Sequence, residues 1–285
     1  MIEISLWEQL TAFADCGTLS EAAEKLHTSQ PALTRSMKRL EAELSLSLFK
    51  RSKNHISLNA TGRMAVNLAR QIVEEDRELV LRLKAYDRSL RTISIGYCAP
   101  VPQMVMTPLI NNLFEGMTIS ADMKEDDDFP ARLLDGTYQL AVLHYPLTDD
   151  RFFCRKCGSE TLYLSVPPSS PLAFYPEIHL SDLNGLSVLL LSRIGFWMNV
   201  VKEKAPKANY MLLVQDSSFM ELASHSGYPC FNSSYFIRRG STIPGRINIP
   251  LADAEGHTDY YLACLSSETR RFSTLFDQMK KTGIS

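Results

Sequence analysis

The sequence predicts an α/β protein in two parts: an N-terminal winged helix-turn-helix that is mainly α, and a larger α/β domain joined to it by a long helix. Three observations support this architecture. Basic residues and short helical patterns are concentrated in the first sixty residues, one uninterrupted helical pattern follows to about residue 90, and strand patterns then alternate with helices. The 285 residues are enough for two or three domains. We therefore expect domains at 1–60, 61–90 and 91–285.

Charge is distributed unevenly along the chain. The formal net charge is −2, yet residues 25–70 contain nine basic and two acidic residues. A basic segment in an otherwise acidic protein predicts a local anionic partner, and the phosphates of DNA are the first candidate. A solvated helix face is the alternative, and charge alone does not separate the two. The pattern of residues around these charges favours DNA.

Three short helices are expected before residue 45. Apolar residues at helical spacing predict a helix over residues 6–14. Ser20 is expected to cap a second helix, and a tight turn at His27 follows it. Ser29 is expected to cap a third helix, with Pro31 in the first turn, where a missing N–H does no harm.

The third helix has an apolar face and a polar, basic face. Two short helices joined by a tight turn, the second one basic, predict a helix-turn-helix. The N-terminal part of the second helix enters the major groove, where Gln can bond adenine and Arg can bond guanine. The candidate DNA-binding residues of this helix are Ser29, Gln30, Pro31, Thr34, Arg35, Lys38 and Arg39.

A β-hairpin is expected directly after these helices. Residues 48–52 and 55–58 are two short alternating segments around a polar turn. The hairpin forms the wing, and its candidate DNA-binding residues are Arg51 and Lys53. Wing cations contact phosphates, which positions a protein on DNA without reading its sequence.

The first ninety residues resemble a known family. The run SEAAEKLHTSQPALTR at residues 20–35 and the pattern LExELxxxLFxR at residues 40–51 are similar to the LysR-type transcriptional regulators. The resemblance implies a winged helix-turn-helix, a linker helix that pairs with a second chain, and an effector-binding domain with two lobes of the periplasmic-binding-protein type. One departure is Asn59, where the family usually has Thr, and Asn caps a helix about as well.

A long helix is expected over residues 61–90. The segment lacks Pro, has its only Gly near the start, and would span roughly 40 Å. Its apolar stripe is too long to be buried against a domain of about sixty residues, so a partner helix is expected, and with it a homodimer or homotetramer. The alternative is a helix packed along its own C-terminal domain. The stripe consists of Met64, Leu68, Ile72, Leu79, Leu83 and Tyr86.

The remaining residues predict a largely parallel sheet in two lobes. Strands are expected to alternate with helices, an arrangement typical of parallel sheets. The first lobe would comprise about 91–165 plus 255–285, and the second 166–254. Strands are expected at 92–96, 117–123, 139–143, 162–166, 188–191 and 211–214, and helices at 104–114, 129–134, 197–204 and 219–224.

The expected effector site lies between these lobes, at the carboxyl ends of strands. Arg193 could complete an anion site or pair with a neighbouring acid, Trp197 could stack on a ring or belong to the core, and His144 could be a buried structural histidine. The acidic run at 125–128 is expected to be a solvated loop. The candidate effector-binding residues are Ala99, Pro100, Val101, His144, Ser192, Arg193, Trp197 and Asn232.

Other classes of function lack their signatures. The sequence contains no GxSxG, GxxxxGK[ST] or HExxH motif, and no GxGxxG after a strand, so we expect no enzyme. Cys154 and Cys157 form a lone CxxC, half of a zinc motif, so neither a metal nor a cofactor is expected. A solute-binding protein would need a secretion signal, and none is visible. With no membrane segment either, a cytoplasmic location is expected.

The sequence therefore predicts a sequence-specific, DNA-binding transcriptional regulator. An unidentified small-molecule co-inducer bound between the lobes would shift the equilibrium between two states of the oligomer on double-stranded DNA. By resemblance to the family, this shift would alter the access of RNA polymerase.

Overall fold

The computed structural model describes residues 2–52 and 55–284. The chain divides into two compact units, Met1–Lys84 and Ala85–Ser285. Within the described residues, no helix is both long enough and apolar enough to span a membrane.

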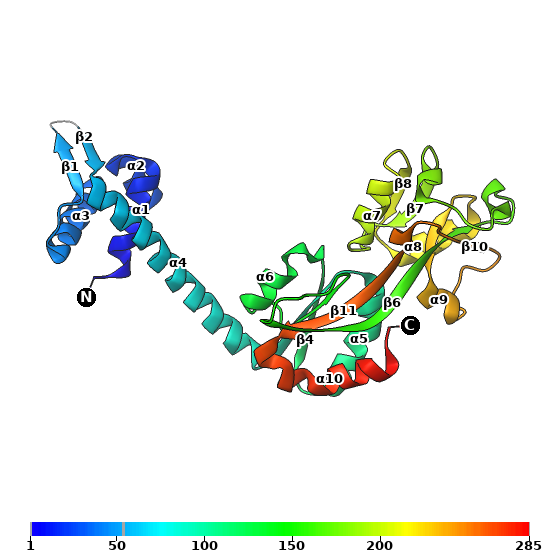
Figure 1. Cartoon of the computed structure of the whole chain (residues 1–285). Helices are drawn as coiled ribbons and strands as arrows, with labels where there is room; N and C mark the ends of the chain where they lie inside the picture. Colours follow the sequence, from blue (N-terminus) through cyan, green and yellow to red (C-terminus); the bar gives the residue numbers. More distant parts are fainter. Residues whose placement is uncertain (1, 53–54, 285) are drawn as a thin grey trace. The chain divides into compact units, whose positions relative to one another are not determined.

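The described residues of the N-terminal unit form three short helices, a hairpin and most of a long helix (Figure 1). Its core is apolar, and the rings of Phe13 and Phe49 meet edge to face with centroids 5.3 Å apart. The Glu41 carboxylate accepts the backbone N–H groups of Leu48 and Phe49 at 2.8 and 3.1 Å, which fixes the hairpin against the third helix. The elements are α1 (Ile4–Cys16), α2 (Leu19–Lys25), α3 (Gln30–Leu44), β1 (Phe49–Ser52) and β2 (His55–Leu58).

The expected N-cap of the second helix is wrong. Gly17 ends α1 in the left-handed region at φ 80°, and Thr18 then becomes the cap of α2. The Thr18 hydroxyl accepts the Glu21 N–H at 3.2 Å. Ser20 lies inside the helix, because the turn after Gly17 is tighter than the sequence pattern indicated.

The expected long helix is α4 (Ala60–Ser89). Asn59 precedes it and accepts the Gly62 N–H at 2.8 Å, as an N-cap does. Val66, Ala69 and Val73 are buried. The stripe described above stays exposed in the single chain, with exposed fractions from 41% for Ile72 to 66% for Tyr86.

The C-terminal unit contains one curved path of strands in the order β4-β3-β5-β11-β6-β9-β7-β8, with β10 paired to β6. We call lobe I the half with β3, β4 and β5, and lobe II the half with β7 to β10. The bounds are β3 (Thr92–Tyr97), β4 (Thr118–Met123), β5 (Leu140–Leu143), β6 (Phe152–Val166), β7 (Ser187–Leu191), β8 (Asn209–Leu213), β9 (Cys230–Ser233), β10 (Ile247–Pro250) and β11 (His257–Leu265).

The strand β6 belongs to both lobes. Its first part pairs antiparallel with β11, from Phe152 to Thr161, and its last part pairs with β9 and β10. In Figure 1, β6 and β11 run side by side as two long arrows. The prediction of a largely parallel sheet is therefore wrong at the centre, where these pairings are antiparallel, and correct within each lobe, where β3 and β7 have parallel neighbours.

Helices cover both lobes. The expected helix at 104–114 begins earlier, at Pro100, and keeps Pro108 inside it. Proline is common in the first turn of a helix, and Pro100 holds that position in α5. Lobe I carries α5 (Pro100–Leu113), α6 (Phe129–Leu134) and α10 (Thr269–Thr282), and lobe II carries α7 (Trp197–Lys204), α8 (Asp216–His225) and α9 (Ser234–Arg238).

The lobes meet where the loop after β7 contacts the loop after β3. The Phe196 N–H donates to the Cys98 carbonyl oxygen at 2.9 Å. Gly195 precedes it in the left-handed region at φ +63°, and a Cβ there would overlap the same carbonyl. Only glycine combines this φ with so close an approach.

Gly195→Ala is therefore expected to destabilise the C-terminal unit by roughly 3 kcal/mol, because backbone strain and steric overlap act together. The control is Gly240→Ala, at φ +64° with open space around it. That variant should lose only about 1 kcal/mol, from strain alone. Urea unfolding of both variants measures the difference, and equal losses would show that the contact at Cys98 is unimportant.

Candidate functional site

The exposed face of α3 carries the predicted DNA-binding residues. The Ser29 hydroxyl accepts the Ala32 N–H at 3.3 Å, so the predicted cap of this helix is confirmed. Pro31 lies exposed in the first turn. Arg35 and Lys38 are exposed, and neither forms an ion pair among the described residues. These two cations are available to an anionic partner.

Two polar side chains near the start of α3 are already hydrogen-bonded. The Ser20 hydroxyl donates to Gln30 Oε1 at 3.1 Å, which leaves the Gln30 amide NH₂ as the group presented outward. The Thr34 hydroxyl donates to the Gln30 carbonyl oxygen at 2.8 Å. Gln30 is thus oriented by its neighbours before any partner binds.

Arg39 differs from the other cations of α3. Its guanidinium donates to Glu3 at 2.8 Å and to Glu43 at 2.7 Å, and these carboxylates raise the pKa of Arg39. The hydrogen bond and charge of Arg39 in turn lower the pKa of Glu3. Arg39 therefore links α3 to the residue before α1.

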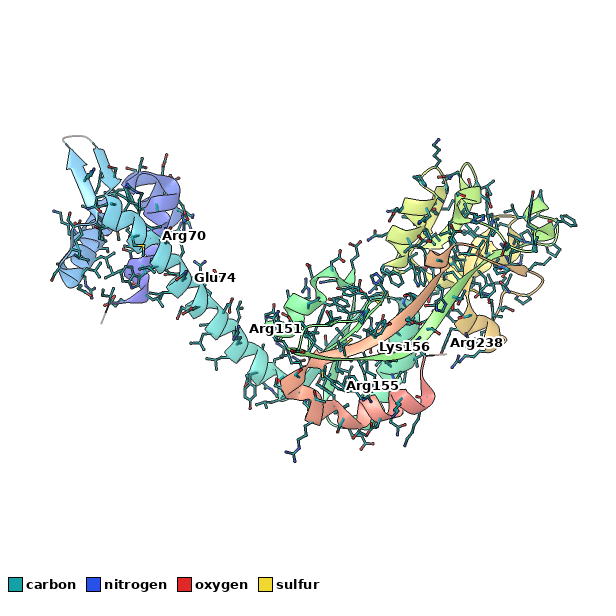
Figure 2. The ribbon with its side chains drawn as sticks, in the orientation of Figure 1. Arg70, Glu74, Arg151, Arg155, Lys156 and Arg238 are labelled. Atoms are coloured by element: carbon teal, nitrogen blue, oxygen red, sulfur yellow. The ribbon has the colours of Figure 1, made fainter. Side chains whose placement is uncertain are left out.

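Of the predicted wing residues, Arg51 lies in β1, and Lys53 lies outside the described residues. β1 pairs antiparallel with β2, and in this register Lys50 lies opposite Ser57. A hollow of about 660 Å³ lies between α1, the end of α2 and α4. Arg70, labelled on α4 in Figure 2, pairs there with Asp15 at 2.6 Å.

In lobe I, two of the predicted effector regions lie at strand ends. Ala99 and Val101 are buried and Pro100 is half-buried, at the point where β3 leads into α5. His144 follows β5. Its ring is stacked on Phe196 of lobe II, with centroids 4.3 Å apart and an interplanar angle of 2°.

His144 is held by a carboxylate from the acidic run. Its N–H donates to Asp126 Oδ2 at 2.9 Å, and its Nδ1 lies 2.7 Å from the same oxygen. Asp126 is only 1% exposed. The expectation of a solvated loop at 125–128 is wrong for this residue, because the run folds into a 3-10 turn that directs Asp126 inward.

In lobe II, the predicted residues are divided between the junction and the surface. Trp197 is 3% exposed and packs in the core of lobe I. Asn232 donates to Asn248 Oδ1 at 3.1 Å. Ser192 is half-buried, and its N–H donates to the Leu213 carbonyl. Arg193 is exposed and forms no ion pair within the part of the chain that the structure describes.

A buried polar cluster at the junction escaped the sequence analysis. The Glu160 carboxylate on β6 is 3% exposed, and the Tyr260 hydroxyl of β11 donates to it. The Trp197 indole N–H and the Ser233 hydroxyl also lie close enough to affect its ionisation. Burial raises the pKa of Glu160, and these three donors lower it by less. We call these four residues the Glu160 cluster.

A sequence signal for this cluster did exist. Glu160 lies in the part of β6 that precedes the expected strand at 162–166. Without a predicted strand there, strand alternation could not predict that the Glu160 side chain is buried. Tyr260 lies in β11, which was missed entirely. Ser233 is the last residue of β9, and alternation along this strand makes Ser233, rather than Asn232, the residue that faces Glu160.

The two cysteines of the CxxC pair lie on β6. Burial raises the pKa of Cys157 to about 12 and that of Cys154 above its ordinary value. Cys154 Sγ accepts the Leu147 N–H at 3.4 Å. Across the described residues, no group of three or more His, Cys, Asp or Glu is arranged to hold a metal ion.

Comparison with protein families covers almost the whole chain. Residues 4–63 match the model of the bacterial regulatory helix-turn-helix protein, lysR family. Residues 64–283 match the model of the LysR substrate binding domain. The chain belongs to the LysR family. The resemblance stated from residues 20–51 is thus confirmed over both units.

Curated LysR-type relatives are moderately similar. The regulator TcbR of Pseudomonas sp. (strain P51) is 32% identical over 196 residues, which are 65% of this chain and 64% of TcbR. Two regulators of Bacillus subtilis (strain 168), YybE and YcgK, are 29% and 26% identical to this chain, and the alignments cover 72% and 56% of their lengths. The alignment with YcgK thus spans little more than half of that protein.

Solved structures agree with the fold. A full-length variant of OxyR from Pseudomonas aeruginosa superposes with a TM-score of 0.51 at 18% identity, covering 98% of this chain and all of that one. A full-length mutant of BenM gives the same TM-score and identity and is covered over 95%. At this identity the likeness concerns the fold, an N-terminal helix-turn-helix followed by a curved-sheet domain.

The raised pKa of Glu160 predicts a pH-dependent stability. The folded chain holds the Glu160 proton more tightly than the unfolded chain, so this contribution is complete below the ordinary carboxyl pKa and is lost as the pH rises through the raised value. Urea unfolding at several pH values should show the stability of wild type falling relative to Glu160→Gln as the pH rises. The exposed Glu115, changed to Gln, is the control. A difference between wild type and Glu160→Gln that is independent of pH would contradict the prediction.

Proposed function

We propose that this protein is a sequence-specific, DNA-binding transcriptional regulator that has no catalytic activity of its own. The single observation that carries the proposal is that two cations on the exposed face of α3, Arg35 and Lys38, form no ion pair with any residue that the structure describes. This face follows a helix start of the type that enters the major groove in helix-turn-helix proteins. Membership of the LysR family, whose relatives are named as transcriptional regulators, supports the same conclusion.

The residues of α3 divide into roles. Gln30 presents amide donors and Arg35 a free guanidinium, which suit the acceptors of base edges. Lys38 is placed farther along the helix and suits a phosphate. We assign Arg39 to the internal structure of the unit, since Glu3 and Glu43 occupy its donors.

Arg35→Ala is expected to weaken binding to a specific promoter fragment by roughly 10-fold to 100-fold while affecting random DNA much less. The matched control is Arg39→Ala, which removes the same charge from the same helix without removing a free guanidinium. Fluorescence anisotropy with promoter and scrambled fragments at one ionic strength measures both. Equal losses on the two fragments for Arg35→Ala would mean that Arg35 does not read bases.

We further propose that the protein assembles through α4 as a homodimer or homotetramer. The apolar stripe of α4 has no partner within the described chain, and exposed apolar stripes on long helices are typical of helix pairing. A dimer also places two α3 helices on one duplex, which matches half-sites about one DNA turn apart.

The double variant Leu79→Arg/Leu83→Arg is expected to be monomeric, because it places two like charges in the C-terminal half of the stripe. The control is Leu81→Arg, which makes the same change on the opposite side of the helix, at a residue that is 58% exposed. Light scattering of the purified full chain separates the two. A dimer that survives the double substitution would show that α4 is not the principal contact.

The effector is proposed to bind between lobes I and II, and its binding to change the access of RNA polymerase to the promoter. The proposed site would lie at the strand ends after β3, β5 and β9, the positions at which open α/β sheets bind ligands. Ligand binding can shift the regulator only by the difference between its affinities for the two states. The side chains between lobes I and II would therefore determine which co-inducer binds.

A further inference from the structure

The start of α3 is joined to α2 by a hydrogen bond between two side chains. The Ser20 hydroxyl of α2 donates to Oε1 of Gln30, the first residue of α3, at 3.1 Å. Both residues are exposed. Neither helix needs this bond for its cap, because Thr18 caps α2 and Ser29 caps α3. The bond therefore lies at the face that the proposed function assigns to DNA, in addition to the bonds that form the helices.

The turn between α2 and α3 brings Ser20 to Gln30. His27 adopts the left-handed region at φ 51°, and the Thr28 N–H closes the turn on the Ala23 carbonyl oxygen at 2.9 Å. Ala23 is buried, and its side chain is only a methyl group, so the two helices can pack closely. Because backbone hydrogen bonds fix this turn, the helix-turn-helix itself sets the position of Ser20 beside Gln30.

The main chain of Gln30 is held as well. The Thr34 hydroxyl donates to the Gln30 carbonyl oxygen at 2.8 Å. Pro31 follows directly, and a proline ring restricts the backbone of the residue before it. A glutamine side chain has several rotatable bonds, whose freedom is lost when the side chain binds a partner. The bond from Ser20 removes part of this freedom beforehand, which makes Gln30 a preorganised reader of a base.

The direction of the bond decides which group of Gln30 is left for a base. Oε1 faces α2 and accepts from Ser20, so the amide NH₂ is the outward group. A free glutamine pairs with adenine by using its oxygen and its NH₂ group together. Guanine instead offers the neighbouring acceptors N7 and O6 in the major groove, and cytosine offers a donor. With Oε1 engaged by Ser20, the NH₂ group of Gln30 suits the guanine edge.

We propose that Ser20 is a positioning residue for base recognition: it holds Oε1 of Gln30 against α2, so that Gln30 donates from its NH₂ group and selects guanine over adenine at one position of the DNA site. The inference rests on the proposed function, because it names a residue that sets the specificity of the same DNA-binding face. Ser20 acts through Gln30, and it carries no charge that would bind a phosphate.

The test uses the full chain to select fragments from a library of randomised double-stranded DNA at one fixed ionic strength. The position that Gln30 reads is the one at which Gln30→Ala loses the base preference of wild type. There we expect wild type to prefer guanine over adenine by roughly tenfold. Ser20→Ala should lower this ratio to about threefold or less, because Oε1 is then free to pair with adenine. Ser20→Thr keeps a hydroxyl and should restore the preference.

Two controls separate positioning from a structural role. Ser36→Ala removes a hydroxyl from the side of α3 that carries the buried residues Leu33 and Leu40, and it should select the same bases as wild type. Ser20→Ala should keep the melting temperature of wild type. It should also keep the salt dependence of binding to random DNA, because the number of phosphate contacts does not change.

The inference is overturned if wild type prefers adenine at the Gln30 position, if Ser20→Ala selects the same bases as wild type, or if Ser20→Ala weakens binding to every fragment equally. It is also overturned if wild type enriches a motif and Gln30→Ala leaves every base preference in place, and the proposed function then stands. A wild-type chain that enriches no motif contradicts the proposed function itself, so the two failures are distinguished.

Discussion

The antiparallel pairing of β6 with β11 is the constraint on which the C-terminal unit depends. This pairing runs from Phe152 to Thr161 and continues directly into the pairing of β6 with β9 and β10. A single strand thus belongs to both lobes, and Glu160 lies where the partner of β6 changes. The side chains of β11 and β9 meet at that point, which is why Tyr260 and Ser233 surround one carboxylate. The contacts of Glu160 therefore involve strands from both parts of the sheet.

The DNA-binding unit uses its charges in two ways. Some cations of the basic segment are neutralised within the protein, as Arg39 is by Glu3 and Glu43 and Arg70 is by Asp15. Arg35 and Lys38 on the exposed face of α3 form no ion pair within residues 2–52 and 55–284. A net charge therefore overstates the number of side chains that can reach a phosphate or a base, and the ion pairs decide which cations are available.

Much of the fold follows from local patterns that act over a few residues. Helical spacing, the Ser29 cap and the uninterrupted run after Asn59 placed α1, α3 and α4, and apolar runs placed β3, β5 and β7. The same reasoning missed β11 and the first ten residues of β6. Those segments mix charged, polar and aromatic residues, since their outward side chains face solvent, and their strand character comes from pairing with each other across a hundred residues.

By itself the sequence determined the helix-turn-helix, its exposed basic residues, the long helix and the family, because each depends on residues close together in the chain. Only the tertiary structure decided which side chains meet between the lobes. Asp126, in the acidic run, is buried and binds His144, and Trp197 packs in the core of lobe I. Arg193 lies at the surface, and Glu160 lies among neutral donors. The physical reason is that burial and pairing of a charge are set by distant strands and loops, which no local pattern records.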